Sequence, residues 1–125
     1  MRDSFQLQSL GNDELIASLV AIVDKDNSLT ADLLAYLAEC DDRQLHLDLG
    51  FPSLFAYCTE SLGFCESKAG RRITAARVCR RFPEAFALVA EGKLHLSALC
   101  SLKHHLTPDN ASELFALCEI GRAHV

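Results

Sequence analysis

The chain has 125 residues, of which 50% are hydrophobic and 23% are charged, and its formal net charge at pH 7 is −5. This length suits one globular domain that buries roughly two thirds of its unfolded surface, and the composition excludes an intrinsically disordered protein. The first residues, MRDSFQLQ, have no hydrophobic signal core, and charges interrupt every long apolar stretch. We therefore expect a cytoplasmic protein without a membrane span.

The apolar spacing is helical along the whole chain, with no sustained alternation that would predict a sheet. Residues 1–11 are expected to form a flexible N-terminus, after which Asn12 can cap a first helix. Asp13 and Glu14 then fall in its first turn, where negative charge is favoured. The sequence therefore predicts an all-α fold that begins with a helix at residue 12.

A seven-residue repeat extends this first helix. Its members are Ile16, Val23, Thr30 and Leu37. The apolar face returns in phase after the polar patch 26–28, which favours one long helix over 12–43 instead of two short ones. We expect this helix to bury one stripe, made of Ile16, Leu19, Val20, Val23, Leu33, Leu34 and Leu37.

Prolines and glycines divide the rest of the chain into about five shorter helices. Phe51-Pro52 opens the first of them, and Pro83 opens another that Gly92 closes. Residues 97–105 predict a further short helix, and Thr107-Pro108-Asp109 combines a capping hydroxyl, a first-turn proline and an acid. Together these elements predict a single small helical domain over residues 12–118.

Residues 53–82 predict a helix, a tight turn at Gly63 and a second helix that is strongly basic. A helix-turn-helix often places glycine in such a turn, because the chain must reverse through a positive φ. Residues 66–82 carry a charge of +5, whereas residues 1–65 carry −8 and residues 83–125 carry −2. DNA is therefore the first partner to consider. Without an exposed basic helix, the same pattern predicts only a helical hairpin packed in a core.

The six cations of this helix fall into two groups on nearly opposite faces, at about 100° per residue. Lys68, Arg71 and Arg72 belong to its N-terminal end, which is the end that recognition helices present to a DNA groove. These three residues are the candidate DNA-binding site. For the second group we expect a solvated face or ion pairs with the acidic N-terminal helix; its members are Arg77, Arg80 and Arg81.

The six cysteines include no C-x-x-C pair, which argues against a structural zinc site. In a chain without a secretion signal we expect reduced thiols that pack as small hydrophobes. Cys100, His104 and His105 lie within two turns and are a weak candidate for metal ligands. The histidines suit the last turn of a helix better, where positive charge is favoured. We expect no metal and no cofactor in this chain.

Four blocks together carry a resemblance to a known family: LGFPSLFAYC, AGRRITAARVCRRFP, EGKLHLSAL and HLTPDN. In this order they resemble the helical region that precedes the nuclease domain in bacterial HNH-endonuclease-like proteins, over about residues 12–118. The chain departs from that family at Cys65, where serine is usual, and at Gly70, where an aromatic residue is usual. A weaker cap and a helical glycine, which costs about 1 kcal/mol, are the expected consequences.

The resemblance implies a non-catalytic module of a longer HNH endonuclease. An HNH site needs a histidine that activates water and further ligands for a divalent ion. The chain contains no such set, and His104-His105 falls in the region that corresponds to the non-catalytic part. We therefore expect no catalytic residues here, and a divalent metal only in the missing nuclease domain.

The last residues, EIGRAHV, match the translation of a common sequencing adapter, GAG ATC GGA AGA GCA CAC GTC, whose next codon is a stop. The resulting hypothesis is that residues 119–125 are an artefactual tail on a truncated chain. The alternative is an ordinary short helical tail.

Two functions remain open from the sequence. One is a DNA-engaging helical module; the other is a protein-interaction or dimerisation module that uses the long N-terminal helix and has no direct nucleic-acid contact. A homodimer through that helix fits either function. Exposure separates them: free cations at 68, 71 and 72 favour DNA, and carboxylates covering those cations favour the interaction module.

Overall fold

The computed structural model describes residues 7–119, and these residues form helices and turns with no strand. The helices are α1 (Asn12–Arg43), α2 (Leu45–Asp48), α3 (Leu54–Ala56), the π-helical turn η1 (Tyr57–Ser61), α4 (Glu66–Arg81), α5 (Glu84–Ala90), α6 (Leu96–Leu102) and α7 (Ala111–Cys118). The predicted all-α fold with a long first helix is confirmed. The hypotheses of a flexible N-terminus and of an artefactual tail concern residues that lie mostly outside the described range.

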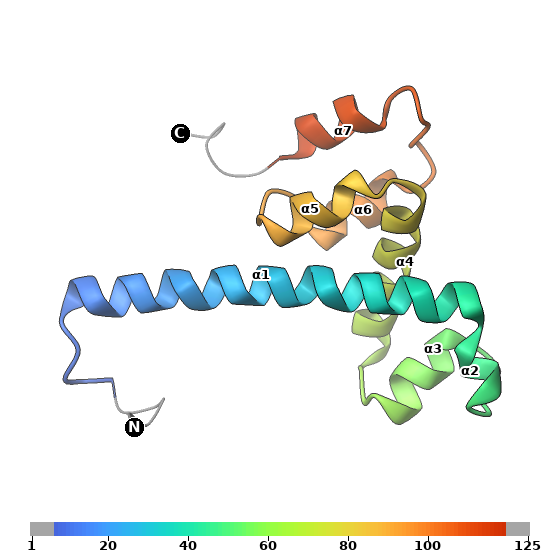
Figure 1. The fold of residues 1–125 in the computed structure, drawn as a ribbon, viewed down its shortest axis with the longest axis horizontal. Coiled ribbons are helices and arrows are strands. Elements are labelled where there is room, and N and C mark those ends of the chain that lie inside the picture. The colour runs from blue at the N-terminus through green and yellow to red at the C-terminus, as the bar shows by residue number, and fades with distance from the viewer. Residues whose placement is uncertain (1–6, 120–125) are drawn as a thin grey trace.

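The long helix α1 runs without interruption over 32 residues, as the seven-residue repeat predicts. Its N-cap is Gly11 and not Asn12, which is already helical, and Asp13 and Glu14 occupy the first turn as expected. The helix ends where Gln44 adopts a left-handed conformation with φ of 52°. Figure 1 shows that one half of α1 crosses the rest of the fold while the other half projects beyond it.

The predicted buried stripe of α1 is only half right. Leu34 and Leu37 are buried and Leu33 is partly buried against the core. By contrast Ile16, Leu19, Val20 and Val23 are 57%, 54%, 53% and 48% exposed. The prediction was wrong for these four residues because α4 and α5 pack against the C-terminal half of α1, and no helix among residues 7–119 covers the other half.

The basic helix α4 is the centre of the fold. It passes behind α1 in Figure 1 and packs against both α1 and α6. Six of its sixteen residues are buried on more than one side: Ala69, Ile73, Ala75, Ala76, Val78 and Cys79. Alanine is frequent there because small side chains let neighbouring helices approach closely. The middle of α4 therefore belongs to the core.

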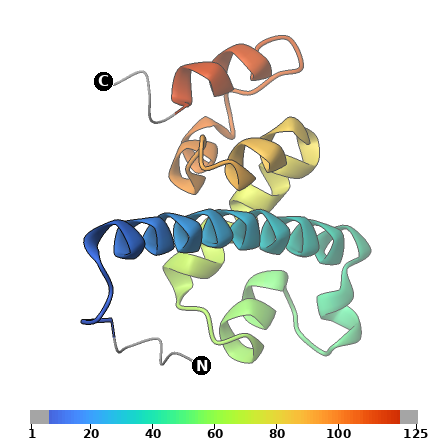
Figure 2. The same ribbon diagram turned by 60° about the vertical axis from the view of Figure 1, so that its left-hand side comes forward.

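The remaining helices form two groups on either side of α1. Figures 1 and 2 both place α2 and α3 on one side, and α5, α6 and α7 on the other. In the second group the ring of Phe115 from α7 meets that of Phe82 edge to face, at a centroid distance of 6.3 Å. One hydrophobic core joins both groups through α4.

Several helices begin later than their proline signals predict. The helix after Pro52 is capped by Ser53, whose Oγ accepts a hydrogen bond from the backbone N–H of Ala56 at 3.0 Å. At Thr107 the reciprocal side-chain hydrogen bonds with Asn110, 2.8 and 3.3 Å long, form a separate turn, and α7 starts only after it. The Ser53 bond caps its helix, whereas the Thr107–Asn110 bonds stabilise a turn in place of a first helical turn and so delay the start of α7.

We expect alanine substitutions at Gly92 and at Gly70 to change the stability of the protein in opposite directions. Gly92 ends α5 with φ of 74°, and a Cβ added there would lie 2.6 Å from Nδ2 of Asn27 on α1. We expect Gly92→Ala to lower the free energy of unfolding by at least the roughly 1–2 kcal/mol cost of a left-handed conformation. Gly70 lies inside α4 with nothing within 4 Å of an added Cβ, so Gly70→Ala should stabilise the protein by about 1 kcal/mol.

Urea denaturation of both variants measures these changes. Equal effects of the two substitutions would contradict the close contact between the Gly92 turn and α1.

Candidate nucleic-acid interface at the start of α4

The predicted helix-turn-helix segment consists of α3 with η1, a turn over 62–65, and α4. Gly63 provides the reversal with φ of 76°, as the sequence predicts. Cys65 is the N-cap of α4, and its side chain makes no capping hydrogen bond. The first residues of α4, Glu66 and Ser67, are exposed, so this end of α4 reaches the surface.

Two of the six cations of α4 are neutralised by α1. Arg77 donates from Nε and Nη2 to the two carboxylate oxygens of Asp41, at 2.9 and 3.0 Å. This pairing lowers the pKa of Asp41 and raises the pKa of Arg77. Arg80 pairs with Glu39 at 2.8 Å and with Asp42 at 3.0 Å. The hydrogen bond from Arg80 is the main cause that lowers the pKa of Glu39.

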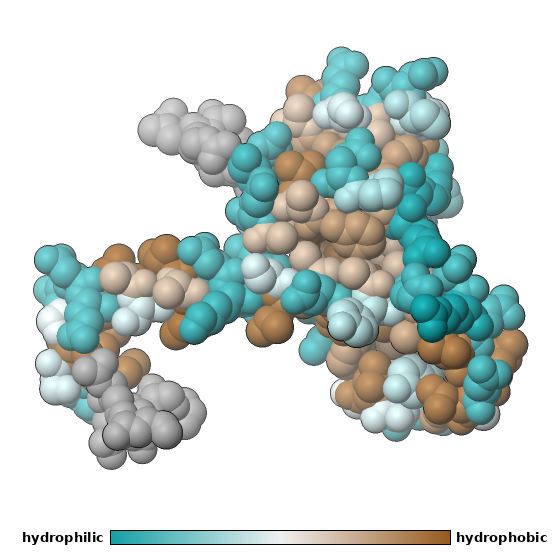
Figure 3. Space-filling view, viewed as in Figure 1, coloured by the Kyte–Doolittle hydropathy of each residue, from teal (hydrophilic) through white to brown (hydrophobic). Residues whose placement is uncertain are grey.

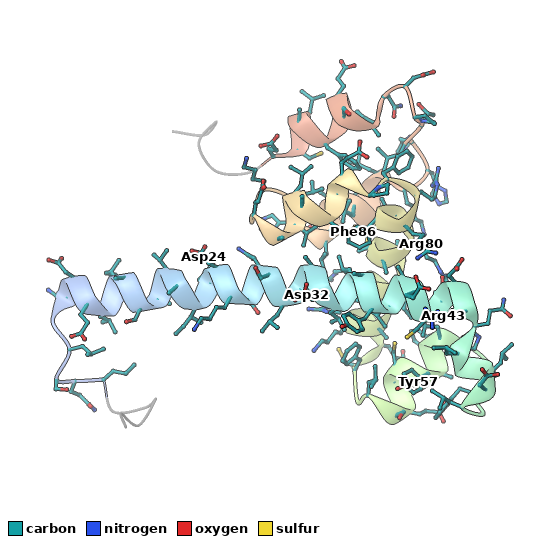
Figure 4. The ribbon with its side chains drawn as sticks, viewed as in Figure 1. Asp24, Asp32, Arg43, Tyr57, Arg80 and Phe86 are labelled. Carbon is teal, nitrogen blue, oxygen red and sulfur yellow. The ribbon has the colours of Figure 1, made fainter. Side chains whose placement is uncertain are left out.

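The expectation of ion pairs with the acidic helix is therefore confirmed for these two arginines. Figure 4 shows Arg80 beside the C-terminal part of α1, close to the end that carries Arg43. Such partly exposed pairs add little stability, but they fix the position of the side chains.

Arg81 is held differently. Its guanidinium lies 4.9 Å from the ring centre of Phe82 and donates to the backbone carbonyls of Lys103 and Leu106, at 3.3 and 3.4 Å. Neither acceptor is a carboxylate, so these hydrogen bonds do not neutralise the positive charge of Arg81. They do tie its side chain to the loop after α6.

The three predicted DNA-binding residues carry no ion pair with any carboxylate of residues 7–119. Lys68 is half-buried and places Nζ over the ring of Phe64, 4.4 Å from its centre. Arg71 is exposed, and only its backbone carbonyl is engaged, by the thiol of Cys100 at 3.5 Å. All three cations lie in the first two turns of α4, and their role in DNA binding stays a prediction.

Arg72 points into an open cavity of about 340 Å³ between α1, α4 and the α5–α6 connection. Its Nε atom is buried and has no hydrogen-bond partner among residues 7–119. Polar lining comes from Asn27, Thr30 and His95, and apolar lining includes Val89. The spacing of residues along the chain did not predict this cavity. The polar patch 26–28, which interrupts the apolar stripe of α1 at the level where Arg72 lies, is the sequence feature that could have indicated it.

The cysteines behave as core residues more than as ligands. Burial raises the pKa of Cys79 to about 12 and also raises that of Cys58 and Cys100. Cys65 is exposed. Within residues 7–119 no three His, Cys, Asp or Glu side chains are grouped as metal ligands would be. His104 and His105 lie in the turn after α6, since that helix ends at Leu102 and not at residue 105.

No helix in the described part of the chain is both long enough and apolar enough to cross a membrane. No protein-family model, curated protein or solved structure matches this chain.

Proposed function

We propose that this chain is the non-catalytic N-terminal helical module of a cytoplasmic, bacterial HNH-endonuclease-like protein. In this proposal it contacts DNA through Lys68, Arg71 and Arg72. The observation that carries the proposal is the division of charge on α4. Carboxylates of α1 neutralise Arg77 and Arg80, whereas the three cations at the start of the helix pair with no carboxylate among residues 7–119.

The shape of α4 limits how DNA can approach. Its centre is buried, and at its C-terminal end carboxylates of α1 already engage Arg77 and Arg80. The first two turns are therefore the part of α4 that we expect to contact a phosphate backbone or a groove edge. Recognition helices make their base contacts with the same N-terminal turns. Arg71 is exposed and free to contact a phosphate, and Lys68 needs only to leave the Phe64 ring. Arg72, which lines the cavity beside α1, would turn outward or contact a phosphate at the cavity mouth.

In this proposal the metal of the nuclease reaction is expected outside this chain. The described residues offer no group of ligands that fits a divalent ion. In the proposal the ion is held by the nuclease domain of the longer protein, and the present chain only positions that domain on DNA.

The number of free cations sets the expected affinity. Three phosphate contacts give a slope of about −2.7 in a plot of log affinity against log salt, at about −0.9 per contact. Because the overall charge of −5 opposes approach, binding of the isolated chain should be no tighter than about 10⁻⁴–10⁻⁶ M. Useful affinity then requires a second copy or the nuclease domain.

The test is the double variant Arg71→Glu/Arg72→Glu in a duplex-DNA binding titration at low salt. We expect loss of binding with unchanged helical content, since glutamate is nearly as good a helix former as arginine. A control with the same charge change, Lys25→Glu/Arg43→Glu, should bind almost as the original protein does, because both side chains are exposed on α1 and neither belongs to the predicted site.

Equal binding by the double variant and by the original protein would remove DNA contact from this helix. The alternative, a protein-interaction module without nucleic-acid contact, would then replace the proposal.

A further inference from the structure

The projecting half of α1 carries an apolar face that no other part of the described chain covers. We name Ile16, Leu19, Val20 and Val23 the overhanging stripe; each is about half exposed. Figure 3 shows hydrophobic side chains along this half of the helix, well away from the body of the fold. The nine residues from Leu15 to Val23 contain no charged side chain, although charges flank them on both sides.

The overhanging stripe is the continuation of the face that α1 buries in the core. Ile16, Val20 and Val23 are spaced three or four residues apart, and the same spacing continues through Asn27 and Thr30 to Leu34, which is fully buried. Residues with this spacing lie on one face of an α-helix. The face is therefore of the kind that packs against other helices, and its uncovered half is suited to contact one more.

An uncovered helix of this length needs such a contact. Isolated helices shorter than about 12–15 residues are marginal in water, and most helical stability in proteins comes from packing an apolar face. Between residues 15 and 27, the described part of the chain shows no side-chain ion pair or hydrogen bond that would hold α1 to the body. Packing against a partner helix is the interaction that would stabilise it.

We propose that the overhanging stripe binds the same stripe of a second copy in an antiparallel, two-fold symmetric dimer. An isologous interface uses one patch twice, and an uncharged aliphatic stripe is complementary to itself. The repeat of Ile16 and Val23 at seven residues suits helix pairing. This proposal is independent of DNA binding.

The body of the fold decides the orientation. On the face that carries the stripe, the turn at Gly92 reaches α1 at Asn27, and α4 and α5 cover α1 from Ala31 onward, where the first buried residue occurs. In a parallel dimer the bodies of the two copies would lie on the same face and at the same height along the helix pair, and they would collide. An antiparallel partner places its body beyond the N-terminal end of α1, where there is room. Its N-terminal end then approaches the cavity lined by Val23, Val89 and Leu96, which extends the apolar contact.

The available area makes this a weak dimer. A segment of about 15 residues is about 22 Å long, and one helical face of that length falls below the roughly 1,200–2,000 Å² of standard stable interfaces. We therefore expect a concentration-dependent equilibrium between monomer and dimer and not an obligate dimer.

Sedimentation equilibrium of the full chain over a dilution series up to about 1 mM tests the proposal. The mass should rise from 13.7 kDa toward twice that value. Ile16→Glu/Leu19→Glu should abolish the rise. The matched control is Ile22→Glu/Leu29→Glu, which replaces the same two residue types on the same helix, at 61% and 66% exposure but off the stripe, and it should still dimerise.

Small-angle scattering of the concentrated sample separates the two orientations, since the antiparallel dimer carries its bodies at opposite ends and is markedly longer. A monomer at every concentration, or equal loss of the dimer in both double variants, would overturn the proposal. A compact dimer with its bodies side by side would overturn the antiparallel arrangement. Circular dichroism and thermal unfolding of each variant confirm that the body is folded, because none of the four substituted residues is buried.

Discussion

Replacing Phe115 by alanine is expected to lower the free energy of unfolding by about 3–5 kcal/mol, the usual cost of removing a buried aromatic ring. Phe115 is 1% exposed, although it belongs to α7, the last described helix. Its ring packs edge to face with Phe82 at the end of α4, with an interplanar angle of 79°. The substitution removes this contact and leaves a cavity between α4 and α7. Urea denaturation followed by circular dichroism measures the loss.

Leu117→Ala is the matched control, because Leu117 lies on the same helix and is 76% exposed. Its effect should stay within about 0.5 kcal/mol. If Phe115→Ala cost as little as the control, α7 would not unfold together with the rest of the chain. The predicted single domain over residues 12–118 would then have to end before α7.

Leu34→Ala is expected to cost about 2–5 kcal/mol, because a buried leucine loses both its apolar contacts and the volume that it fills. Leu34 is fully buried, with 0% exposure, in the part of α1 that packs against α4 and α5. The variant should keep the helical content of the original protein at low temperature and unfold at lower denaturant concentration. The midpoint and slope of a urea titration separate a change of stability from a change of compactness.

The control for this position is Leu29→Ala, at 66% exposure on the same helix. We expect a change within about 0.5 kcal/mol. A cost below about 1 kcal/mol for Leu34→Ala would mean that the C-terminal half of α1 is not packed in the body. The antiparallel orientation of the dimer would then lose its basis, since it depends on α4 and α5 covering this face of α1.

The two proposals assign DNA contact and self-association to different surfaces of the molecule. Contact with DNA uses the start of α4, and self-association uses the opposite end of α1 from the ion pairs with Arg77 and Arg80. A dimer would present two copies of the basic end and would double the number of phosphate contacts, which steepens the salt dependence accordingly. Each proposal nevertheless fails or survives by its own variants.

Local patterns along the sequence were sufficient for much of the fold. Apolar residues recurring through 12–43 predicted one long helix, because an interruption of three polar residues did not shift the phase of the repeat. Glycines at 63 and 92 predicted chain reversals, and both adopt the positive φ that glycine allows. The separation of α4 cations into two groups predicted either a solvated face or ion pairs with the acidic helix for Arg77, Arg80 and Arg81. Arg77 and Arg80 form those ion pairs, whereas Arg81 donates to backbone carbonyls.

Other features were decided only by tertiary structure. Periodicity identifies which face of α1 is apolar, but it does not tell how far the other helices reach along it, so Ile16 and Leu19 were predicted to be buried and are exposed. The cavity around Arg72 likewise depends on how α1 and α4 cross, which no spacing within either helix specifies. A helical pattern is a property of residues a few positions apart, whereas burial depends on segments far apart in the chain. The sequence of this protein therefore determined its helices and their apolar faces, and the packing of α4 and α5 against half of α1 decided which of those faces remain available to a partner.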